Sequence, residues 1–189
     1  MNFKKDLLLI DLETTGLDSA RHEIIQLAAI VLDKKTLKEK ASFASFVRPA
    51  KWQTRDKESM TVNKISHDQV VAAPPLKKVL GEFEELFDYN EVIISYYGGP
   101  LDMDFLRLAY KKVGKKYKFD HHYFNLWGAF FVFLAAKNKL KNTGRFAGFT
   151  LDDIMKSFNI RSGSRHDALE DCRVEAEVLR RVLYSQIHG

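Results

Sequence analysis

Two acidic residues stand two positions apart at the end of a short apolar run, in the segment LLLIDLETTG (7–16). Successive side chains of a β-strand point to opposite faces, so Asp11 and Glu13 share a face if this segment is a strand. Neighbouring carboxylates repel each other unless a cation lies between them, and hard divalent cations such as Mg²⁺ prefer oxygen ligands. The pattern indicates part of a metal site. Taken alone, it also fits two acids at the solvated end of a strand.

A second group of acids lies in HDALEDC (166–172), where the last predicted helix begins. At about 100° per residue, Asp171 falls at the edge of the apolar stripe of this helix, whereas Asp167 is further round and Glu170 faces away. Glu175 also falls near the stripe. The spacing therefore favours Asp171 as the inward acid and leaves Glu175 as a supporting group or the partner of an arginine.

The helix predicted over 101–113 offers a similar choice between two acids. Asp102 shares a face with apolar residues, whereas Asp104 shares one with Arg107 and Lys111 and can make ordinary surface pairs there. Asp102 also follows a buried strand and a turn, and ligands of α/β sheets gather at such strand ends. We therefore predict that Asp102 is the inward acid.

His166 precedes the last helix, five residues before Asp171. A neutral histidine can accept a proton from water near pH 7, so a general base is one interpretation. A capping or surface histidine is the other. His121 and His122 resemble solvated residues more.

The elements that must position these residues begin with strands and continue with helices that alternate with strands. Hydrophobic periodicity predicts strands at 6–13, 23–33, 40–49 and 91–97, and helices at 74–88, 101–113, 124–140, 150–158 and 166–187. Thr150 is a candidate cap for its helix. Turns separate the first three strands, which favours an antiparallel meander, and residues 50–66 look polar and irregular. This order favours an α/β fold with a mixed sheet.

Composition narrows the classes of function. The 189 residues, with no linker or repeat, fit one domain over 1–189, and the net charge of +5 leans toward an acidic partner such as nucleic acid. The single cysteine, Cys172, rules out a disulfide framework and fits a reducing, cytoplasmic location. The longest apolar stretch, 123–136, is shorter than the ~20 residues of a membrane span, so no membrane partner is expected. Lysine-rich segments are either solvated loop tips or phosphate contacts, and they lie at 34–40, 111–118 and 137–145.

Taken together, DLETTG (11–16), LDMDFL (101–106) and HDALEDC (166–172) resemble the three motifs of the DEDDh 3′–5′ exonucleases, a family of the RNase H-like superfamily. Within that family the pattern is most similar to the epsilon subunits of DNA polymerase III and to RNase T, and it covers almost the whole chain. The resemblance implies an RNase H-like mixed sheet, in which parallel strands extend a three-stranded antiparallel meander and α-helices flank the sheet.

The resemblance also implies roles for residues at matching positions. Asp11, Glu13, Asp102 and Asp171 would hold two divalent metal ions, Mg²⁺ or Mn²⁺, and His166 would be the general base. The implied reaction removes nucleoside 5′-monophosphates from single-stranded or frayed 3′ ends. DNA is the expected substrate, with RNA left open.

Substrate contacts are implied for the turn after the first strand. Its residues would hold the terminal nucleotide, with the last of them against the final base: Thr14, Thr15, Gly16 and Leu17. The chain departs from the family where His-Asn often precedes the second motif, because Tyr97 and Gly98 stand there. Tyr97 is then a candidate for stacking on a base or binding a phosphate.

Two other functions compete with the exonuclease. One is a module of the same fold that binds 3′ ends with little or no turnover, and its support is the Tyr97–Gly98 departure. The other is a two-metal hydrolase of small nucleotides. The chain ends soon after the last predicted helix. No segment that would recruit a polymerase is evident, which favours a stand-alone enzyme.

Overall fold

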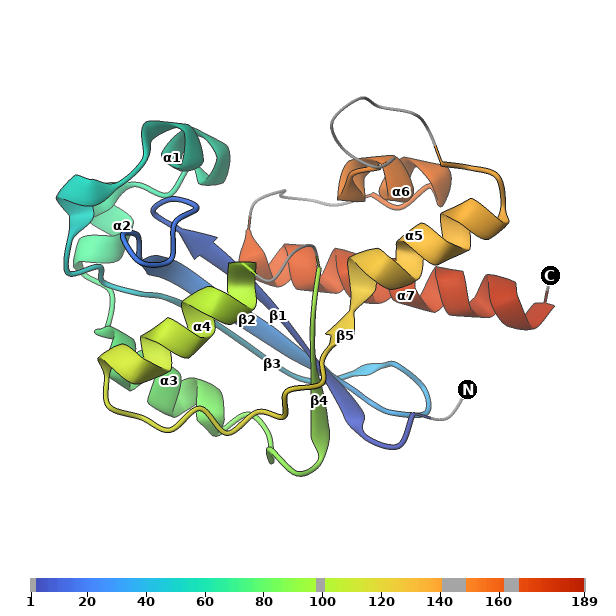
Figure 1. Cartoon of the computed structure of the whole chain (residues 1–189), viewed down its shortest axis with the longest axis horizontal. Coiled ribbons are helices and arrows are strands. Elements are labelled where there is room, and N and C mark those ends of the chain that lie inside the picture. Colours follow the sequence, from blue (N-terminus) through green and yellow to red (C-terminus); the bar gives the residue numbers. More distant parts are fainter. Residues whose placement is uncertain (1–2, 98–100, 141–148, 162–166, 189) are drawn as a thin grey trace.

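The structure is a computed structural model that describes residues 3–97, 101–140, 149–161 and 167–188. Its sheet has five strands in the order β3-β2-β1-β4-β5 (Figure 1). The strands are β1 (Asp6–Thr14), β2 (Ile24–Leu32), β3 (Glu39–Phe46), β4 (Val92–Tyr96) and β5 (Phe124–Asn125). The helices are α1 (Lys57–Asn63), α2 (His67–Val71), α3 (Leu76–Glu84), α4 (Leu101–Lys112), α5 (Leu126–Ala136), α6 (Leu151–Ser157) and α7 (Ala168–His188).

The sheet is mixed, as the sequence predicts. β1 pairs antiparallel with β2, and β2 pairs antiparallel with β3, which is the expected meander. β4 pairs parallel with β1, and β5 pairs parallel with β4. The parallel strands extend the meander on the β1 side, and helices flank the sheet (Figure 1). This confirms the predicted fold class.

Both faces of β1 are buried, which explains its continuous apolar run. Leu7 and Leu9 pack into a core with α5, α6 and α7, whereas Leu8 and Ile10 pack into a second core with α3 and α4. Because side chains alternate along a strand, Asp11 continues the series of Leu7 and Leu9. The strand therefore directs this carboxylate toward the side of the sheet that α7 covers.

The structure differs from the sequence prediction in three regions, one of which is the short helix α2, at residues for which no element was predicted. Residues 50–66, predicted to be irregular, contain a 3₁₀ turn at Trp52–Thr54 and helix α1. The helix predicted over 124–140 is shorter, because Phe124–Asn125 pairs with the sheet as β5 and α5 covers only Leu126–Ala136. The side chain of Asn125 accepts a hydrogen bond from the Gly128 N–H and caps α5.

The other helix ends follow the sequence more closely. Thr150 caps α6 in a capping box with Asp153, as the sequence predicts for Thr150. Among the described residues, no helix is long and apolar enough to cross a membrane.

Candidate metal centre

The end of β1 holds the first two acids of the site. Asp11 pairs with Ala28, and Glu13 with Gln26, in the regular part of the β1–β2 ladder, and the register shifts between Glu13 and Thr14. Asp11 and Glu13 are half-buried, whereas Leu12 between them is buried. The alternation predicted from the sequence is therefore present, with both carboxylates on one face of a strand that the core fixes on both sides.

Helix α7 brings the third acid to the same place. Asp171 is buried in the first turn of α7. Asp11, Glu13 and Asp171 each offer a carboxylate oxygen, and these oxygens all lie within 4.8 Å of one another. Carboxylate oxygens at this spacing are a donor set that suits a hard divalent cation, so these residues fit Mg²⁺ or Mn²⁺.

A buried glutamine fixes the start of α7 against β2. The Gln26 side chain donates to Asp167 Oδ2 at 3.4 Å and accepts from the Ala168 N–H at 3.4 Å. Asp167 also accepts from the backbone N–H groups of Leu169 and Glu170, each at 3.2 Å, which caps the helix. Gln26 was not among the predicted site residues. Its signal in the sequence is that it is the one polar residue of IIQLAAIVL, the strand β2.

Asp102 approaches from the other side of the site, in the first turn of α4. Asp104 is exposed, whereas Asp102 is half-buried, so the predicted choice of inward acid is confirmed. Burial raises the pKa of Asp102 to about 7. The negative charge of Asp102 also contributes to the raised pKa of Asp11, so the two carboxyl groups repel each other.

Asp11 is the electrostatic centre of the cluster. Its pKa lies well above the usual value, first because the carboxyl group is buried, and then because of the charges on Glu175, Asp102, Glu13 and Asp171. Such a group of acids is strained by mutual repulsion when no cation is bound. A divalent cation would relieve this repulsion, which is a second reason why these residues fit a metal site.

The turn at 14–17 follows these acids directly. The Thr14 hydroxyl donates to the Gly16 carbonyl at 2.8 Å, and the buried Thr15 hydroxyl accepts from the Glu23 N–H at 3.0 Å. Both hydroxyl groups thus stabilise the turn itself. Leu17 is 71% exposed, so its side chain is available to a ligand. A Cβ atom on Gly16 would lie 2.4 Å from the His22 ring, which explains the glycine.

Helix α1 braces this turn from the region predicted to be irregular. The buried Asn63 side chain donates to the Thr14 carbonyl at 3.1 Å, and the Asp56 N–H donates to the Thr15 carbonyl at 2.7 Å. Asp56 also caps α1 by accepting from the Ser59 N–H. Sequence reasoning missed Asn63, and a lone asparagine in a polar segment carries no signal that distinguishes it from a surface residue.

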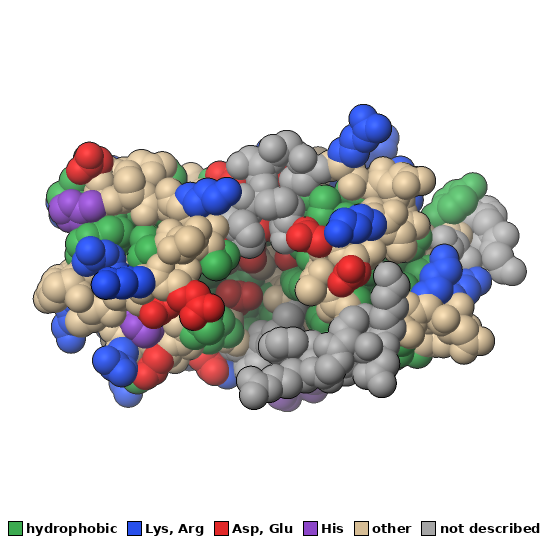
Figure 2. Space-filling view, turned by 90° about the horizontal axis from the view of Figure 1, so that it is seen from above, with side chains coloured by type: hydrophobic (Ala, Val, Ile, Leu, Met, Phe, Trp, Pro, Cys, Tyr) green, Lys and Arg blue, Asp and Glu red, His purple; other side chains and the backbone are tan. Residues whose placement is uncertain are grey.

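A cavity of about 430 Å³ opens onto the acids. Its lining includes Asp11, Glu13, Asp171 and Glu175, together with Tyr97, whose ring lies 6.0 Å from that of Phe130. Figure 2 shows acidic side chains recessed in a hollow near the middle of this face of the molecule. The structure thus brings Tyr97 to the acids, whereas His166 and Gly98 lie outside the described residues.

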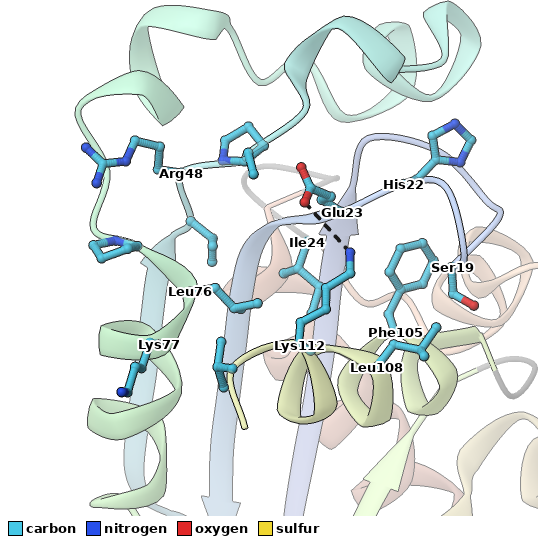
Figure 3. A pocket seen from close by; sticks show the side chains of 16 residues that line it. Ser19, His22, Glu23, Ile24, Arg48, Leu76, Lys77, Phe105, Leu108 and Lys112 are labelled. Carbon is cyan, nitrogen blue, oxygen red and sulfur yellow. Dashed lines mark ion pairs between the residues drawn. The ribbon is translucent and has the colours of Figure 1, made fainter. Parts of the chain in front are cut away.

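A second cavity, of about 370 Å³, lies on the α3–α4 side of the sheet. Its floor is apolar and includes Ile24, Phe105 and Leu108, and Lys112 reaches across it to Glu23 at 3.7 Å (Figure 3). Its lining contains none of the clustered acids. It is therefore separate from the candidate metal centre.

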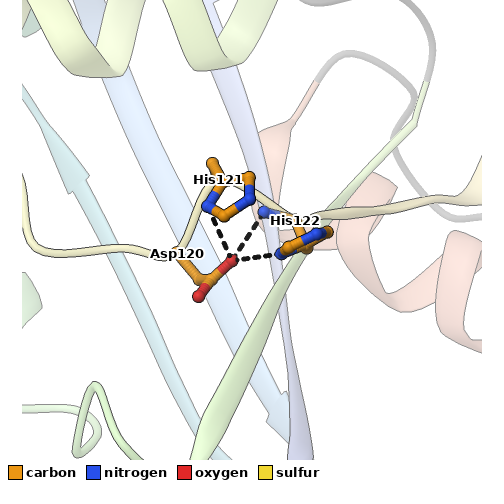
Figure 4. Close-up of side chains that lie close together, drawn as sticks. All are labelled: Asp120, His121 and His122. Carbon is orange, nitrogen blue, oxygen red and sulfur yellow. Dashed lines mark hydrogen bonds and ion pairs between the residues drawn. The ribbon is translucent and has the colours of Figure 1, made fainter.

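A second group of potential metal ligands is exposed, unlike the clustered acids. Asp120, His121 and His122 are consecutive and exposed, and Asp120 Oδ1 lies 2.7 Å from His122 Nδ1 and 3.4 Å from His121 Nδ1 (Figure 4). The two histidines are solvated, as the sequence indicates. Their contacts with Asp120 are local, between residues close together in the sequence.

The chain matches an exonuclease family and DNA polymerase III proteins. The family RNase_T, described as exonuclease, matches over residues 8–179. The epsilon subunit of DNA polymerase III from Aquifex aeolicus is 28% identical over 177 residues, which cover 93% of this chain and 79% of that protein. A PolC-type DNA polymerase III from Thermotoga petrophila is 26% identical over 174 residues, covering 92% of this chain but only 12% of that protein.

Solved nuclease structures share the fold. Exonuclease I superposes with a TM-score of 0.82 at 17% identity, over 96% of this chain and 41% of that one. The nuclease domain of 3′hExo, a DEDDh family member, superposes with a TM-score of 0.73 at 19% identity, over 97% of this chain and 94% of that one. The RNase_T match spans the acids at the end of β1, the start of α4 and the first turn of α7. The chain therefore belongs to the RNase_T exonuclease family, within the DEDDh 3′–5′ exonucleases.

Proposed function

We propose that the protein is a metal-dependent 3′–5′ exonuclease that releases nucleoside 5′-monophosphates from single-stranded or frayed 3′ ends. The observation that supports this most directly is the meeting of Asp11, Glu13 and Asp171 within 4.8 Å in a chain of an exonuclease family. Asp102 adds a fourth carboxylate from a separate element. The charges of Glu13, Asp102 and Asp171 all raise the pKa of Asp11, and acids that repel one another in this way are costly to fold unless they serve a ligand.

Two divalent cations held by these acids would activate the attacking water and stabilise the charge that develops on the phosphate and the leaving oxygen. Asp11, Glu13, Asp102 and Asp171 are the proposed ligands. Their positions are fixed by β1, α4 and α7, and the packed core beneath β1 keeps Asp11 and Glu13 from drifting. The number and identity of the ions are part of the proposal.

His166 is the proposed general base, on the strength of its position in the third motif, five residues before Asp171. It would take the proton from the attacking water. The exposed side chain of Leu17 would pack against the terminal base, and the braced turn around it would hold the 3′ end. Tyr97, in the wall of the cavity, is the proposed replacement for the histidine that the family often carries there.

Single strands are the proposed substrate. Among the matching structures, Exonuclease I from E. coli was solved in complex with a dA16 oligonucleotide, and the 3′hExo domain was solved bound to rAMP. Those ligands are one DNA and one ribonucleotide, so they favour neither sugar for this chain. Stacking against Leu17 and Tyr97 would tolerate any base sequence.

The cellular setting is proposed on weaker grounds. The single buried cysteine fits a cytoplasmic, reducing location. The relatives include DNA polymerase III proteins, of which this chain covers 12% in one case and 79% in another, so a polymerase partner is not assigned.

The test is cleavage of 5′-labelled single-stranded DNA and RNA of the same sequence, with Mg²⁺, Mn²⁺ or EDTA. We expect a ladder that shortens from the 3′ end with either cation and no cleavage in EDTA. The relative rates on the two strands give the sugar preference. Asp171→Asn, which keeps the shape of the side chain but removes its charge, is expected to be inactive.

Asp104→Asn is the matched control, because it removes an exposed acid two residues from Asp102. It is expected to keep the wild-type rate. If wild-type protein binds 3′ ends tightly but leaves them intact with every cation, the protein is a binding module of the same fold, and the exonuclease proposal is wrong.

A further inference from the structure

Glu175 lies deeper in the protein than the acids of the three motifs. Its side chain is 1% exposed, compared with 7% for Asp171, one helical turn earlier on α7. Its neighbours along the helix, Val174 and Ala176, are buried and apolar. Glu175 nevertheless lines the same cavity as Asp11, Glu13 and Asp171. A carboxyl group therefore stands at the inner wall of the candidate metal centre, in a position where an apolar side chain would fill the core.

The electrostatics connect Glu175 to Asp11 in particular. After burial, the charge of Glu175 is the largest cause of the raised pKa of Asp11, ahead of Asp102, Glu13 and Asp171. Coulomb interaction is weakened less by solvent inside a protein than at its surface, so a buried carboxyl group in the same cavity can act strongly on Asp11. Glu175 and Asp11 line the same cavity, and Glu175 is the more buried of the two.

The arginines of α7 form ion pairs with other acids. Arg173 pairs with Glu39 and Glu170, and Arg180 and Arg181 pair with Glu177. These pairs lie on the outer side of the helix, where Arg173 and Arg181 are exposed. Glu175 lies on the buried side of α7, where it lines the cavity together with Asp11 and Asp171.

We propose that Glu175 is a fifth carboxylate of the metal centre, which raises the affinity of the site for divalent cations and keeps Asp11 directed toward them. This rests on the proposed function, because it takes the acid cluster to be a metal site. Glu175 acts as a positioning residue for Asp11 and does not touch the nucleic acid.

The proposal predicts a definite loss of affinity. Groups that support metal ligands from behind typically change metal affinity by about 10–100-fold when they are removed. Glu175→Gln keeps the shape of the side chain and removes its charge, so we expect Mn²⁺ to bind about 10–100-fold more weakly. Calorimetric titration of the purified variant with Mn²⁺, in the absence of nucleic acid, measures this directly.

The thermal stability of the metal-free protein distinguishes a charged role of Glu175 from a role in core packing alone. Loss of one negative charge relieves repulsion in the cluster, so Glu175→Gln is expected to have a higher Tm than wild type in EDTA. A residue that only packed or hydrogen-bonded in the core would lower the Tm when replaced. Glu175→Met, which also removes the charge and keeps the volume, is the second neutral variant and should change Tm and affinity in the same directions.

Kinetics provide an independent measurement. For Glu175→Gln, the Mn²⁺ concentration for half-maximal rate should rise by the factor seen in calorimetry. Glu170→Gln is the matched control, because Glu170 lies on the same helix but pairs with Arg173 on its outer side. It should bind Mn²⁺ as wild type does.

The outcomes distinguish this proposal from the proposed function. If wild-type protein binds Mn²⁺ and both neutral variants bind it equally well, Glu175 has no role in the metal centre and only this proposal fails. If Glu170→Gln weakens binding as much as Glu175→Gln, the effect is one of overall charge and the proposal also fails. If wild-type protein binds no divalent cation, the metal centre itself is wrong and both proposals fall.

Discussion

At the scale of single residues, the sequence identified the inward acids wherever one face of an element was clearly apolar. Asp102 and Asp104 were separated correctly because two residues on a helix lie far apart around its axis. Asp171 and Glu175 were harder to separate, since residues four apart lie on nearly the same face. The structure shows that both point inward. Helical periodicity alone does not predict that one buried face carries two carboxylates.

The first prediction concerns the acid at the end of β1. Asp11→Asn removes the charge at the centre of the cluster and weakens the hold on a cation that would stabilise transition-state charge, so nuclease activity should fall by about 10²–10³-fold. The Tm in EDTA should not fall, because the substitution removes repulsion. Activity on labelled single strands and thermal unfolding are the two measurements. Activity near the wild-type rate would show that Asp11 is not a ligand.

The second prediction follows from the raised pKa of Asp102, about 7 in the folded protein against 3.8 for an unperturbed aspartate. Between these values the unfolded chain releases its proton before the folded protein does. The stabilising contribution is therefore complete below about pH 4 and is lost as the pH rises toward 7. In EDTA, Asp102→Asn should be more stable than wild type at pH 8 by at least about 2 °C in Tm, with a smaller difference at pH 5.

Thermal unfolding at both pH values, with Asp104→Asn measured alongside, tests this. The control should follow wild type at each pH, because Asp104 is exposed. A wild-type Tm that exceeds that of Asp102→Asn by the same amount at both pH values would mean that Asp102 stabilises the fold through a hydrogen bond and not as a repelled charge.

At the scale of elements, long segments with a clear hydrophobic period were predictable from the sequence. Short segments that depend on contacts with the rest of the protein were not. The buried runs of β1 and β2 and the amphipathic pattern of α4 identify these elements without any tertiary contact. Helix α1 has few buried residues of its own and depends on the Asp56 cap and the Asn63 contact with Thr14. β5 has two residues, too few for a periodic pattern, and exists because β4 offers it a free edge. Such elements depend on contacts that a single sequence does not display.

The third prediction tests whether α1 supports the substrate turn. Asn63→Ala removes the hydrogen bond to the Thr14 carbonyl and leaves that group without the partner seen here, at a cost of about 1–3 kcal/mol. We expect a lower Tm and a several-fold higher KM for single strands, with a smaller change in kcat. Thr61→Ala, at an exposed position of the same helix, should change neither. A Tm loss with unchanged KM would restrict Asn63 to a structural role.

At the scale of the whole molecule, the position of a lysine decides whether it can contact a nucleic acid bound at the acids. The lysines of 34–40 lie in and after the β2–β3 turn, next to the start of β1 and opposite the end that holds the acids. Lys40 pairs with Asp6 at 2.7 Å, and Lys115 pairs with Glu84. For Lys40 and Lys115 the structure favours the solvated-surface interpretation over contact with a phosphate backbone near the site. The net charge alone did not reveal this distribution.

The fourth prediction concerns that distribution. The value of kcat/KM on single strands should fall as KCl is raised, by about 0.7 in logarithmic slope for each phosphate contact. Lys35→Ala, at the far end of the sheet, should leave this slope unchanged. A shallower slope in this variant would show that the strand extends past the sheet to the β2–β3 turn.

The central claim is that the protein removes nucleotides from the 3′ end by metal-dependent hydrolysis. It is tested most directly by following a single strand labelled on its 3′-terminal nucleotide, with Mg²⁺ and with EDTA. We predict that the label leaves first and entirely as a nucleoside 5′-monophosphate with Mg²⁺, and not at all with EDTA or with Asp171→Asn. Release of the label in longer fragments, or at the same rate in EDTA, would contradict the account.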